Sequence, residues 1–311
     1  ATESQGEEDR ASPSRLAMKV ARTQRVLAWF LLVQGQWTEA RERYLRSLRS
    51  ATEHGDRVNE ILSLSGLGVV ERWLGEIKIG TAHVETAVRM ARELRDPRLI
   101  LHALIRAYST NGGRDLGRRP EAGLEEALHL SRRLGDGWSE AHAFNGLGDL
   151  HAEQGDYSSA QIEYAKALKG FRDLGDDWLA AWSLEGLGRI ELHAGACKSS
   201  IRDTGECIRL FAEVGDRVNA GLSLRTLGYA LRLAGDLSSG ARVLGACTSL
   251  LCELPTLDRR TAHGPELEIA CSESRDGFPR EWAEGRAMSY EETIEHVLAL
   301  SNNRSTSAYS T

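Results

Sequence analysis

Apolar and polar residues along most of the chain recur at three- and four-residue steps, which is the spacing of amphipathic helices rather than strands. Between Asp136 and Asp176, one apolar stripe runs from Ala141 to His151 and a second from Ala160 to Phe171. Gly155 separates the two stripes and is followed by an aspartate. Glycine suits the left-handed residue that ends a helix, and aspartate suits the N-cap of the next one. The segment therefore predicts two helices that meet at a tight corner.

This two-helix pattern repeats with a period of forty residues. An aspartate marks the start of successive copies at Asp56, Asp96, Asp136, Asp176 and Asp216. A glycine marks the inner corner at Gly35, Gly75, Gly155, Gly195 and Gly235. A fixed period of this length is the signature of stacked supersecondary structures. We predict an all-α protein, a right-handed α-solenoid of about six helix pairs with at least twelve helices and essentially no strand, followed by a C-terminal helical cap.

Domain boundaries follow from where this period begins and ends. We assign residues 15–253 to the repeat solenoid and residues 254–300 to the cap, in which glycines and prolines interrupt the period. Ser289 and Glu292 have the spacing of a capping box, which predicts a last helix of about ten residues. Residues 1–14 and 301–311 are polar, serine-rich tails that we expect to be disordered.

The third copy departs most from the pattern. Its corner, residues 109–121, is longer and richer in glycine and arginine than the others. Pro120 stands where other copies have Ala160 or Gly240. Because proline fits only the first turn of a helix, the second helix of this copy is predicted to start late.

The small and large residues of the fourth copy resemble those of the tetratricopeptide repeat family. The matching positions are Leu147, Gly148, Gly155, Ala160, Tyr164 and Ala167. That family uses about 34 residues per helix pair, and this chain has about six more. The long form resembles the C-terminal regions of large bacterial signalling ATPases of the STAND-like kind, including LuxR-type transcription regulators. Leu27–Leu48 resembles their entry repeat, and Gly240–Leu250 and Glu281–Leu300 resemble their terminal cap. The resemblance implies a tetratricopeptide-like region that binds or senses a partner.

Composition and charge exclude several classes of protein. The longest apolar run, Val26 to Val33, is far shorter than the roughly 20 residues of a membrane span, and no secretory signal is present. The formal net charge of −6 gives no global attraction for nucleic acid or an acidic membrane, so we expect neither as a partner. Five cysteines without a CxxC pair indicate reduced thiols in a cytoplasmic protein. The chain begins at Ala1 rather than Met, and we expect it to be a piece of a longer protein.

No motif in the sequence supports catalysis, a metal or a cofactor. The phosphate loop GxxxxGK[ST], the zinc motif HExxH and the nucleophile elbow GxSxG are all absent. Glycine-leucine-glycine triplets at 66–68, 146–148 and 186–188 fall inside predicted helices and recur at the repeat period. They therefore indicate close helix packing rather than a nucleotide-binding turn.

The sequence does offer a candidate binding surface. The first helix of each stacked pair lines the concave side of a solenoid. In the fourth copy three residues lie off the apolar packing stripe, and the same helical phase selects their counterparts elsewhere. The candidate groove residues are Arg22, Arg25, Trp29, Trp73, His102, His142, Asn145, Asp149, Trp182, Glu185, Arg189, Arg225 and Tyr229. Tryptophan, tyrosine and arginine are enriched at binding hot spots, although such aromatics also pack between neighbouring repeats.

Three functions remain open on the sequence alone. The first is a non-catalytic region of a larger ATP-dependent signalling or transcription regulator, which binds a protein, a peptide or a small effector in the groove. The second is a free-standing adaptor that bridges two proteins. The third, an enzyme built on an α-solenoid, has no nucleophile, metal or phosphate motif in its favour.

Overall fold

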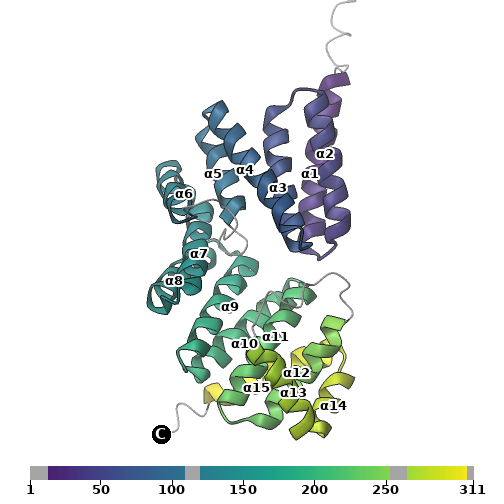
Figure 1. Cartoon of the computed structure of the whole chain (residues 1–311), viewed down its shortest axis with the longest axis vertical. Coiled ribbons are helices and arrows are strands. Elements are labelled where there is room, and N and C mark those ends of the chain that lie inside the picture. The colour runs from purple at the N-terminus through teal and green to yellow at the C-terminus, as the bar shows by residue number, and fades with distance from the viewer. Residues whose placement is uncertain (1–12, 109–119, 253–264, 307–311) are drawn as a thin grey trace, which may run out of the picture. The chain divides into compact units, whose positions relative to one another are not determined.

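The computed structural model describes residues 13–108, 120–252 and 265–306, which form fifteen helices and no strand (Figure 1). This confirms the all-α prediction and its minimum of twelve helices. The described chain falls into two compact units, an N-terminal unit that ends at Leu134 and a C-terminal unit that begins at Gly135. None of the described helices combines the length and the apolar character needed to cross a membrane.

The N-terminal unit is a stack of three helix pairs. Its first helices are α1 (Pro13–Val33), α3 (Arg57–Trp73) and α5 (Pro97–Tyr108), and its second helices are α2 (Trp37–Glu53), α4 (Ile77–Leu94) and α6 (Pro120–Leu134). Each helix packs against the next along the chain, and the first helices also contact one another. This is the nearest-neighbour packing of a helical repeat.

The C-terminal unit continues the same pattern with three more pairs and a terminal segment. Its first helices are α7 (Gly137–Glu153), α9 (Asp177–His193) and α11 (Arg217–Leu233), and its second helices are α8 (Tyr157–Asp173), α10 (Cys197–Glu213) and α12 (Leu237–Cys252). The terminal helices are α13 (Pro265–Gly277), α14 (Pro279–Ala287) and α15 (Tyr290–Thr306). Within the described residues, helices that begin at 137, 177 and 217 reproduce the forty-residue period.

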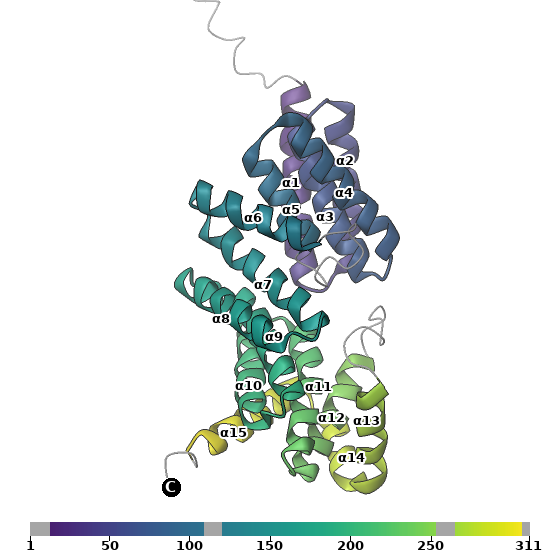
Figure 2. The same cartoon turned by 60° about the vertical axis from the view of Figure 1, so that its left-hand side comes forward.

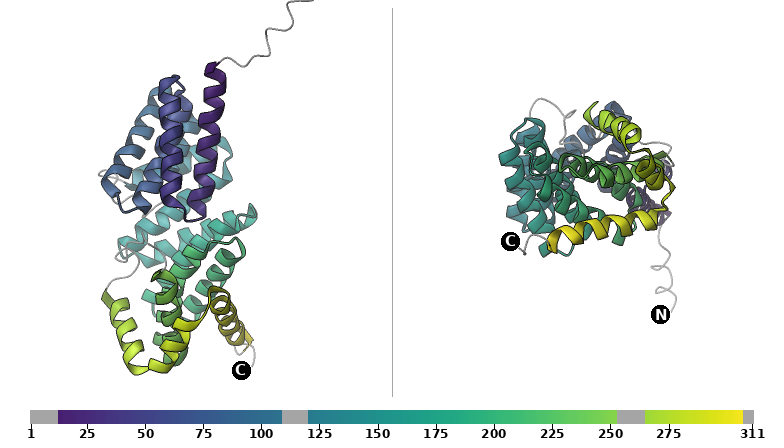
Figure 3. Two further views of the ribbon diagram at one scale, coloured as in Figure 1. Left: turned by 90° about the vertical axis from the view of Figure 1, so that its right-hand side faces the viewer. Right: turned by 90° about the horizontal axis from the view of Figure 1, so that it is seen from below.

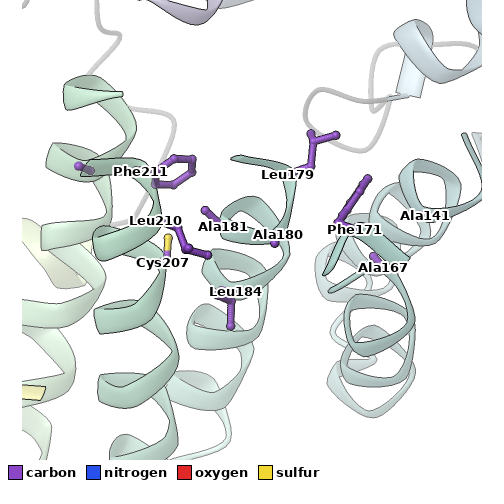
Figure 4. Packing of buried hydrophobic residues seen from close by; sticks show 11 residues of the cluster. Ala141, Ala167, Phe171, Leu179, Ala180, Ala181, Leu184, Cys207, Leu210 and Phe211 are labelled. Atoms are coloured by element: carbon purple, nitrogen blue, oxygen red, sulfur yellow. The ribbon is translucent and has the colours of Figure 1, made fainter. Parts of the chain in front are cut away.

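A continuous apolar core holds α8, α9 and α10 together (Figure 4). Phe171 of α8 and Phe211 of α10 lie one period apart, and each is almost completely buried. Alanines of α9, among them Ala180 and Ala181, are fully buried between them. Small residues on the middle helix thus let large residues from both outer helices approach, at a gain of roughly 25 cal/mol for each Å² of apolar surface buried.

The predicted corner chemistry is present in the structure. The carboxylate of Asp136 accepts a hydrogen bond from the backbone N–H of Ser139 at 3.0 Å, and Asp156 accepts one from Ser159 at 3.1 Å. Gly155 has φ +78°, the left-handed conformation expected at the end of a helix. One described corner lacks glycine: Arg95 adopts φ +55° there, where an L side chain is strained.

We expect Gly155→Val to lower the free energy of unfolding by about 1–2 kcal/mol. Nothing lies within 4 Å of a Cβ at this position, so the cost comes from the backbone conformation alone. Arg95→Gly places glycine at a corner whose residue already has a positive φ angle, so it removes backbone strain. We expect this variant to be as stable as the wild type or slightly more stable. Urea denaturation of the two variants measures both effects. A Gly155→Val variant as stable as the wild type would contradict the role of this glycine as a left-handed helix end.

The glycine-leucine-glycine triplets lie inside helices and permit close packing, as predicted. A Cβ on Gly148 would lie 2.7 Å from the ring of Tyr164, and a Cβ on Gly186 would lie 2.5 Å from the same ring. These two glycines belong to the first helices of consecutive copies, α7 and α9. The tyrosine of α8 is therefore seated between them, which offsets the roughly 1 kcal/mol that each helical glycine costs relative to alanine.

The irregular third copy and the end of the chain show where the pattern changes. α6 is described from Pro120 onward, and residues 117–119, where the period would place its first turn, lie outside the described residues, so the late start stays a prediction. The remainder of the longer corner lies outside the described residues. Ser289 and Glu292 form the predicted capping box, with backbone-to-side-chain distances of 2.8 and 3.1 Å.

The last helix is longer than predicted. α15 has 17 residues instead of about ten, and it reaches Thr306, inside the segment 301–311 that we expected to be disordered. At the other end α1 begins at Pro13, two residues inside the predicted tail of 1–14. α14 packs against α12, whereas α15 returns to pack against α10 and α12 (Figure 3). Ile294 and Val297, on the apolar face of α15, pack into the cores of the C-terminal unit.

Candidate binding surfaces

The predicted groove positions of the C-terminal unit form one surface, which we call the C-terminal first-helix face. It consists of Asn145, Asp149, Glu185, Arg189, Arg225 and Tyr229, contributed by α7, α9 and α11 (Figure 2). α7 contacts α9, and α9 contacts α11, so residues one period apart are neighbours on this face. The Ser183 hydroxyl of α9 donates a hydrogen bond to the Oδ1 atom of Asn145 at 2.9 Å, which ties two of these helices together.

Arg189 is the centre of a charged network on this face. Its Nη2 atom lies 3.5 Å from Oδ1 of Asp149, and its Nε atom lies 3.5 Å from Oε2 of Glu185. The buried Tyr164 hydroxyl donates to Asp149 at 2.6 Å and accepts from Arg189 at 3.3 Å. Glu185 is the main reason why the pKa of Arg189 is raised, and burial is the main reason why the pKa of Tyr164 is well above its ordinary value. The network therefore keeps the guanidinium of Arg189 paired with carboxylates, although a third of this side chain is exposed to solvent.

Arg225 lies on the next first helix, α11, one period after Glu185, and it differs from Arg189 in its burial and in its partners. Only 8% of its surface is exposed. Its Nε and Nη2 atoms are buried and have no hydrogen-bond partner among the residues that the structure describes. Tyr229, one turn further along α11, packs together with Cys271 against an apolar cluster that contains Leu244 and Trp282. The face thus contains one neutralised arginine and one whose Nε and Nη2 atoms have no partner among the described residues.

Two predicted groove residues of this unit pack between helices. The ring of His142 meets Phe171 with 5.2 Å between centroids, and the ring of Trp182, one period later, meets Phe211 at 5.7 Å. Both contacts are edge-on, an arrangement that favours aromatic pairs in cores. We therefore assign these two side chains to packing between first and second helices and leave them out of the proposed binding surface.

The N-terminal unit has a corresponding surface on α1, α3 and α5, but its chemistry is different. The Arg106 guanidinium lies over the ring of Trp29, with 4.0 Å between Cζ and the ring centroid. Arg25 donates from Nε to Oδ1 of Asn59 at 3.4 Å. Burial lowers the pKa of both arginines, and for Arg106 the charge of Arg25 adds to this effect. This face is therefore basic and aromatic.

The other predicted positions of the N-terminal unit differ in exposure. Arg22 is exposed to solvent, and Trp73 packs edge-on against Trp37 with 5.5 Å between ring centroids. Burial, followed by the charges of Arg106 and Arg25, lowers the pKa of His102 to about 3. The imidazole of His102 is therefore neutral at physiological pH.

Sequence reasoning missed two residues that shape these faces. Arg106 occupies the position at which other copies have Gly66 or Gly186, and this exception to the period was the signal that could have revealed it. Tyr164 belongs to a second helix, and we had assigned it to that helix's apolar stripe. Its ring is buried as predicted, but its hydroxyl reaches the first-helix face at Asp149.

Metal ligands and surface depressions are the two remaining features that bear on chemistry. The described residues contain no group of three or more His, Cys, Asp or Glu side chains placed to hold a metal ion. An open depression of about 700 Å³ lies beside α4 and α5, lined in part by Arg89, Arg92 and Tyr108. Arg89 is paired with Glu93 at 2.8 Å and Arg92 with Glu126 at 2.5 Å, so these two arginines are already neutralised.

A buried pair of acids joins α9 and α10. Glu191 and Asp203 are each about 8% exposed, and Asp203 accepts a hydrogen bond from Nε of Arg202 at 2.6 Å. Burial, followed by the charge of Asp203, raises the pKa of Glu191 to about 7. The equivalent pair of the second copy is Glu71 and His83, whose Oε2 and Nδ1 atoms are 2.6 Å apart. The same two positions thus hold an acid–base pair in one unit and two acids in the other.

We expect the free energy of unfolding to fall as the pH rises from about 4.5 to about 7. The folded chain keeps Glu191 protonated over this range while the unfolded chain ionises it, so acid favours the folded state. Glu191→Gln should remove this part of the pH dependence. At pH 8 the variant should be more stable than the wild type by up to about 3 kcal/mol. Urea denaturation at pH 5 and pH 8 tests this, and an unchanged pH dependence in the variant would contradict it.

Comparison with solved structures identifies the architecture. A signal transduction ATPase with numerous domains (STAND) from Pyrococcus horikoshii, described as having a tetratricopeptide repeat sensor, matches with a TM-score of 0.57 and 14% identity. The match covers 95% of this chain and 44% of that one. The chain has the tetratricopeptide-like helical repeat fold. The same repeat fold matches BtubC (BKLC) from P. vanneervenii with a TM-score of 0.51 and 16% identity, over 81% of this chain and 94% of that one. No protein-family model matches the sequence, and no curated protein matches it.

Proposed function

We propose that this chain is the non-catalytic binding and sensing region of a larger cytoplasmic, ATP-dependent signalling or transcription regulator. A protein, a peptide or a small effector would bind on its first-helix faces, and the bound state would act on a nucleotide switch elsewhere in the same protein. The structural similarity to the STAND protein from Pyrococcus horikoshii supports this proposal. Nearly the whole of this chain matches less than half of that larger protein, which is described as having a tetratricopeptide repeat sensor.

The observation that carries the proposal is the C-terminal first-helix face. A helical surface whose only task is to stay soluble has no need to bury charged groups, because burial costs free energy unless the charge is paired. Here three consecutive first helices hold two acids and two arginines in two rows with a forty-residue step, Asp149 with Arg189 and Glu185 with Arg225. The hydroxyl of the buried Tyr164 on α8 donates a hydrogen bond to Asp149. Arginine and tyrosine are enriched at binding hot spots. A face of this composition is suited to hold a polar ligand.

A free-standing adaptor is the second candidate. BtubC matches this chain over 94% of its own length, so a repeat fold of this kind also forms nearly the whole of another protein. The genomic sequence upstream of the Ala1 codon separates the two candidates. An in-frame ATPase with a phosphate loop supports the regulator, and a start codon beside Ala1 without such a module supports the adaptor.

Binding at the face is tested by affinity capture from extract of the source cells. The bait is wild type, the double variant Arg189→Ala with Arg225→Ala, or the control Arg209→Ala on the second helix α10. We expect at least one protein to be recovered equally by wild type and control and at least tenfold less by the double variant. Circular dichroism confirms that all three baits are equally helical. Equal recovery of every protein by all baits would place the binding surface elsewhere.

A further inference from the structure

The outer side of α1 carries a row of exposed apolar residues, which we call the α1 stripe. It consists of Leu16, Val20, Leu27 and Phe30, whose three-, four- and seven-residue steps place them on one side of the helix. Their exposed fractions lie between 42% and 60%. α1 packs against α2 and α3 and lies at the edge of the N-terminal unit (Figure 3). Scattered apolar residues are ordinary on a protein surface, whereas residues gathered on one face mark an interaction surface.

The forty-residue period shows which kind of element covers these positions in later copies. Leu27 and Phe30 correspond to Leu187 and Ile190 on α9, four periods later. Those two residues are only 6% and 3% exposed, because α8, the second helix of the preceding copy, packs over them. The α1 stripe therefore has the positions and the spacing of a surface that receives a helix.

The two ends of the repeats differ in how they are covered. At the C-terminal end α12 packs against α13, α14 and α15. At the other end α1 is the first helix of the described residues, and no second helix covers it there. Residues 1–12 contain alanine as their only aliphatic residue, so their composition offers no apolar face for the α1 stripe.

The charge of the first copy indicates the chemistry of a covering helix. Residues 13–53 contain eight basic and three acidic residues, although the whole chain has a net charge of −6. α1 itself contains no acidic residue, and its exposed Lys19 and Arg22 lie in the row beside the α1 stripe. Surfaces of like charge repel one another, and surfaces of opposite charge attract. An acidic helix therefore fits this surface better than a second copy of α1 does.

We propose that the α1 stripe is the docking site for an acidic amphipathic helix of a partner protein. The apolar side of that helix packs on Leu27 and Phe30, and its acidic residues face Lys19 and Arg22. The contact reproduces the one by which α8 covers α9, with the covering helix supplied by the partner. This surface lies at the end of the repeats and is additional to the first-helix faces of the proposed function.

A peptide based on α10 is the probe for this site. Ile201 and Ile208 of α10 pack in one cluster with Leu227, which is the equivalent of Leu27 five periods later. The peptide copies residues 197–213 with serine in place of both cysteines, and a staple on its solvent side keeps it helical. In the acidic form every Lys and Arg is replaced by Glu, and in the basic form every Asp and Glu is replaced by Lys.

Fluorescence anisotropy measures the affinity of the two labelled peptides for the wild-type chain. The acidic form should bind at least tenfold tighter than the basic form, since only its charges complement those beside the α1 stripe. Equal affinities of the two forms, or no binding of either, overturn the proposal.

A pair of double variants tests whether the apolar residues hold the peptide. Leu16→Ser with Phe30→Ser removes the two most exposed members of the α1 stripe and should weaken binding of the acidic peptide at least tenfold. The control, Ile162→Ser with Leu174→Ser, removes residues of similar exposure, 56% and 52%, from the second helix α8 and its C-cap. It should bind like the wild type, and circular dichroism compares the helical content of the variants. Equal binding by both double variants would place the peptide elsewhere and overturn the proposal.

A charge-reversal variant tests the electrostatic part without touching the core. The side chains of Lys19 and Arg22 are exposed, so Lys19→Glu with Arg22→Glu should leave the fold intact. This variant should bind the basic peptide more tightly than the acidic one. A preference unchanged from wild type would contradict the proposal, and this readout holds even if the serine variant does not fold.

Two measurements on the chain alone address other occupants of the α1 stripe. Light scattering coupled to size-exclusion chromatography should show a monomer, and a dimer that the serine variant abolishes would identify a second copy as the occupant. Cosedimentation with vesicles of phosphatidylcholine and phosphatidylserine should leave the chain in solution. Pelleting of the wild type but not of the serine variant would identify a membrane surface. Either of these two outcomes overturns the proposal.

Discussion

Tyr164→Ala is expected to lower the free energy of unfolding by about 3–5 kcal/mol. The side chain is fully buried, and its ring lies between the helical glycines Gly148 and Gly186. Removing the ring leaves a cavity between two helices, and the glycines that line it have no side chain that could fill the space. Because a helix backbone is rigid, we expect little relaxation around the cavity. Urea denaturation of the wild type and the variant measures the difference.

Tyr164→Phe is the control that separates the ring from the hydroxyl. It keeps the packing but leaves Asp149 without the donor that now lies 2.6 Å away, so we expect a loss of about 1–2 kcal/mol. Equal losses for the Ala and Phe variants would show that the hydrogen bond, and not the packing of the ring, gives Tyr164 its importance.

Gly285→Ala should also destabilise strongly, by about 3 kcal/mol, through a different mechanism. α12 and α14 approach so closely that a Cβ on Gly285 would overlap the carbonyl oxygen of Arg242. A Cβ on Gly245 would in turn overlap the carbonyl oxygen of Trp282. Because the obstacle is backbone rather than a flexible side chain, the two helices have to move apart, and overpacking of this kind is costly.

Gly277→Ala provides the matched comparison for this prediction. Gly277 also belongs to the terminal helices, but nothing lies within 4 Å of a Cβ built there. The change should alter stability by less than about 1 kcal/mol. Tryptophan fluorescence during urea unfolding reports on both variants, because Trp282 is buried where α14 meets α12. A Gly285→Ala variant that unfolds like Gly277→Ala would argue against backbone contact between these helices.

The architecture was predictable because its signals are local and repeated. Asp136 and Gly155 each act within a few residues of their own position, as a cap and as a helix end, and the period repeats the same evidence along the chain. Pro120 is a local signal of the same kind, since the restriction on its φ angle confines it to the first turn of a helix, and α6 is described from this residue onward. The right-handed sense of the solenoid and the division into repeats and cap stay predictions.

The candidate site was less predictable because it depends on what faces each residue across two or three helices. Helical phase selected both Trp182 and Arg189, yet the first packs against Phe211 and the second faces two carboxylates. The missing partner of Arg225 could not be inferred from the sequence either, since it is a property of the neighbouring helices. The packing of α15 against α10 and α12 could not be inferred from the sequence for the same reason.

The position of α15 has a consequence for how the C-terminal unit unfolds. In a simple stack each repeat contacts only its neighbours, so the end of the stack can fray one helix pair at a time. α15 connects the end of the chain to α10, a helix of the fifth copy, through Ile294 on one core cluster and Val297 on another. Loss of the sixth copy would therefore also remove contacts from the fifth. We therefore expect α15 to couple the unfolding of the sixth copy to that of the fifth, so that its seventeen residues stabilise α10, a helix that begins nearly a hundred residues earlier in the chain.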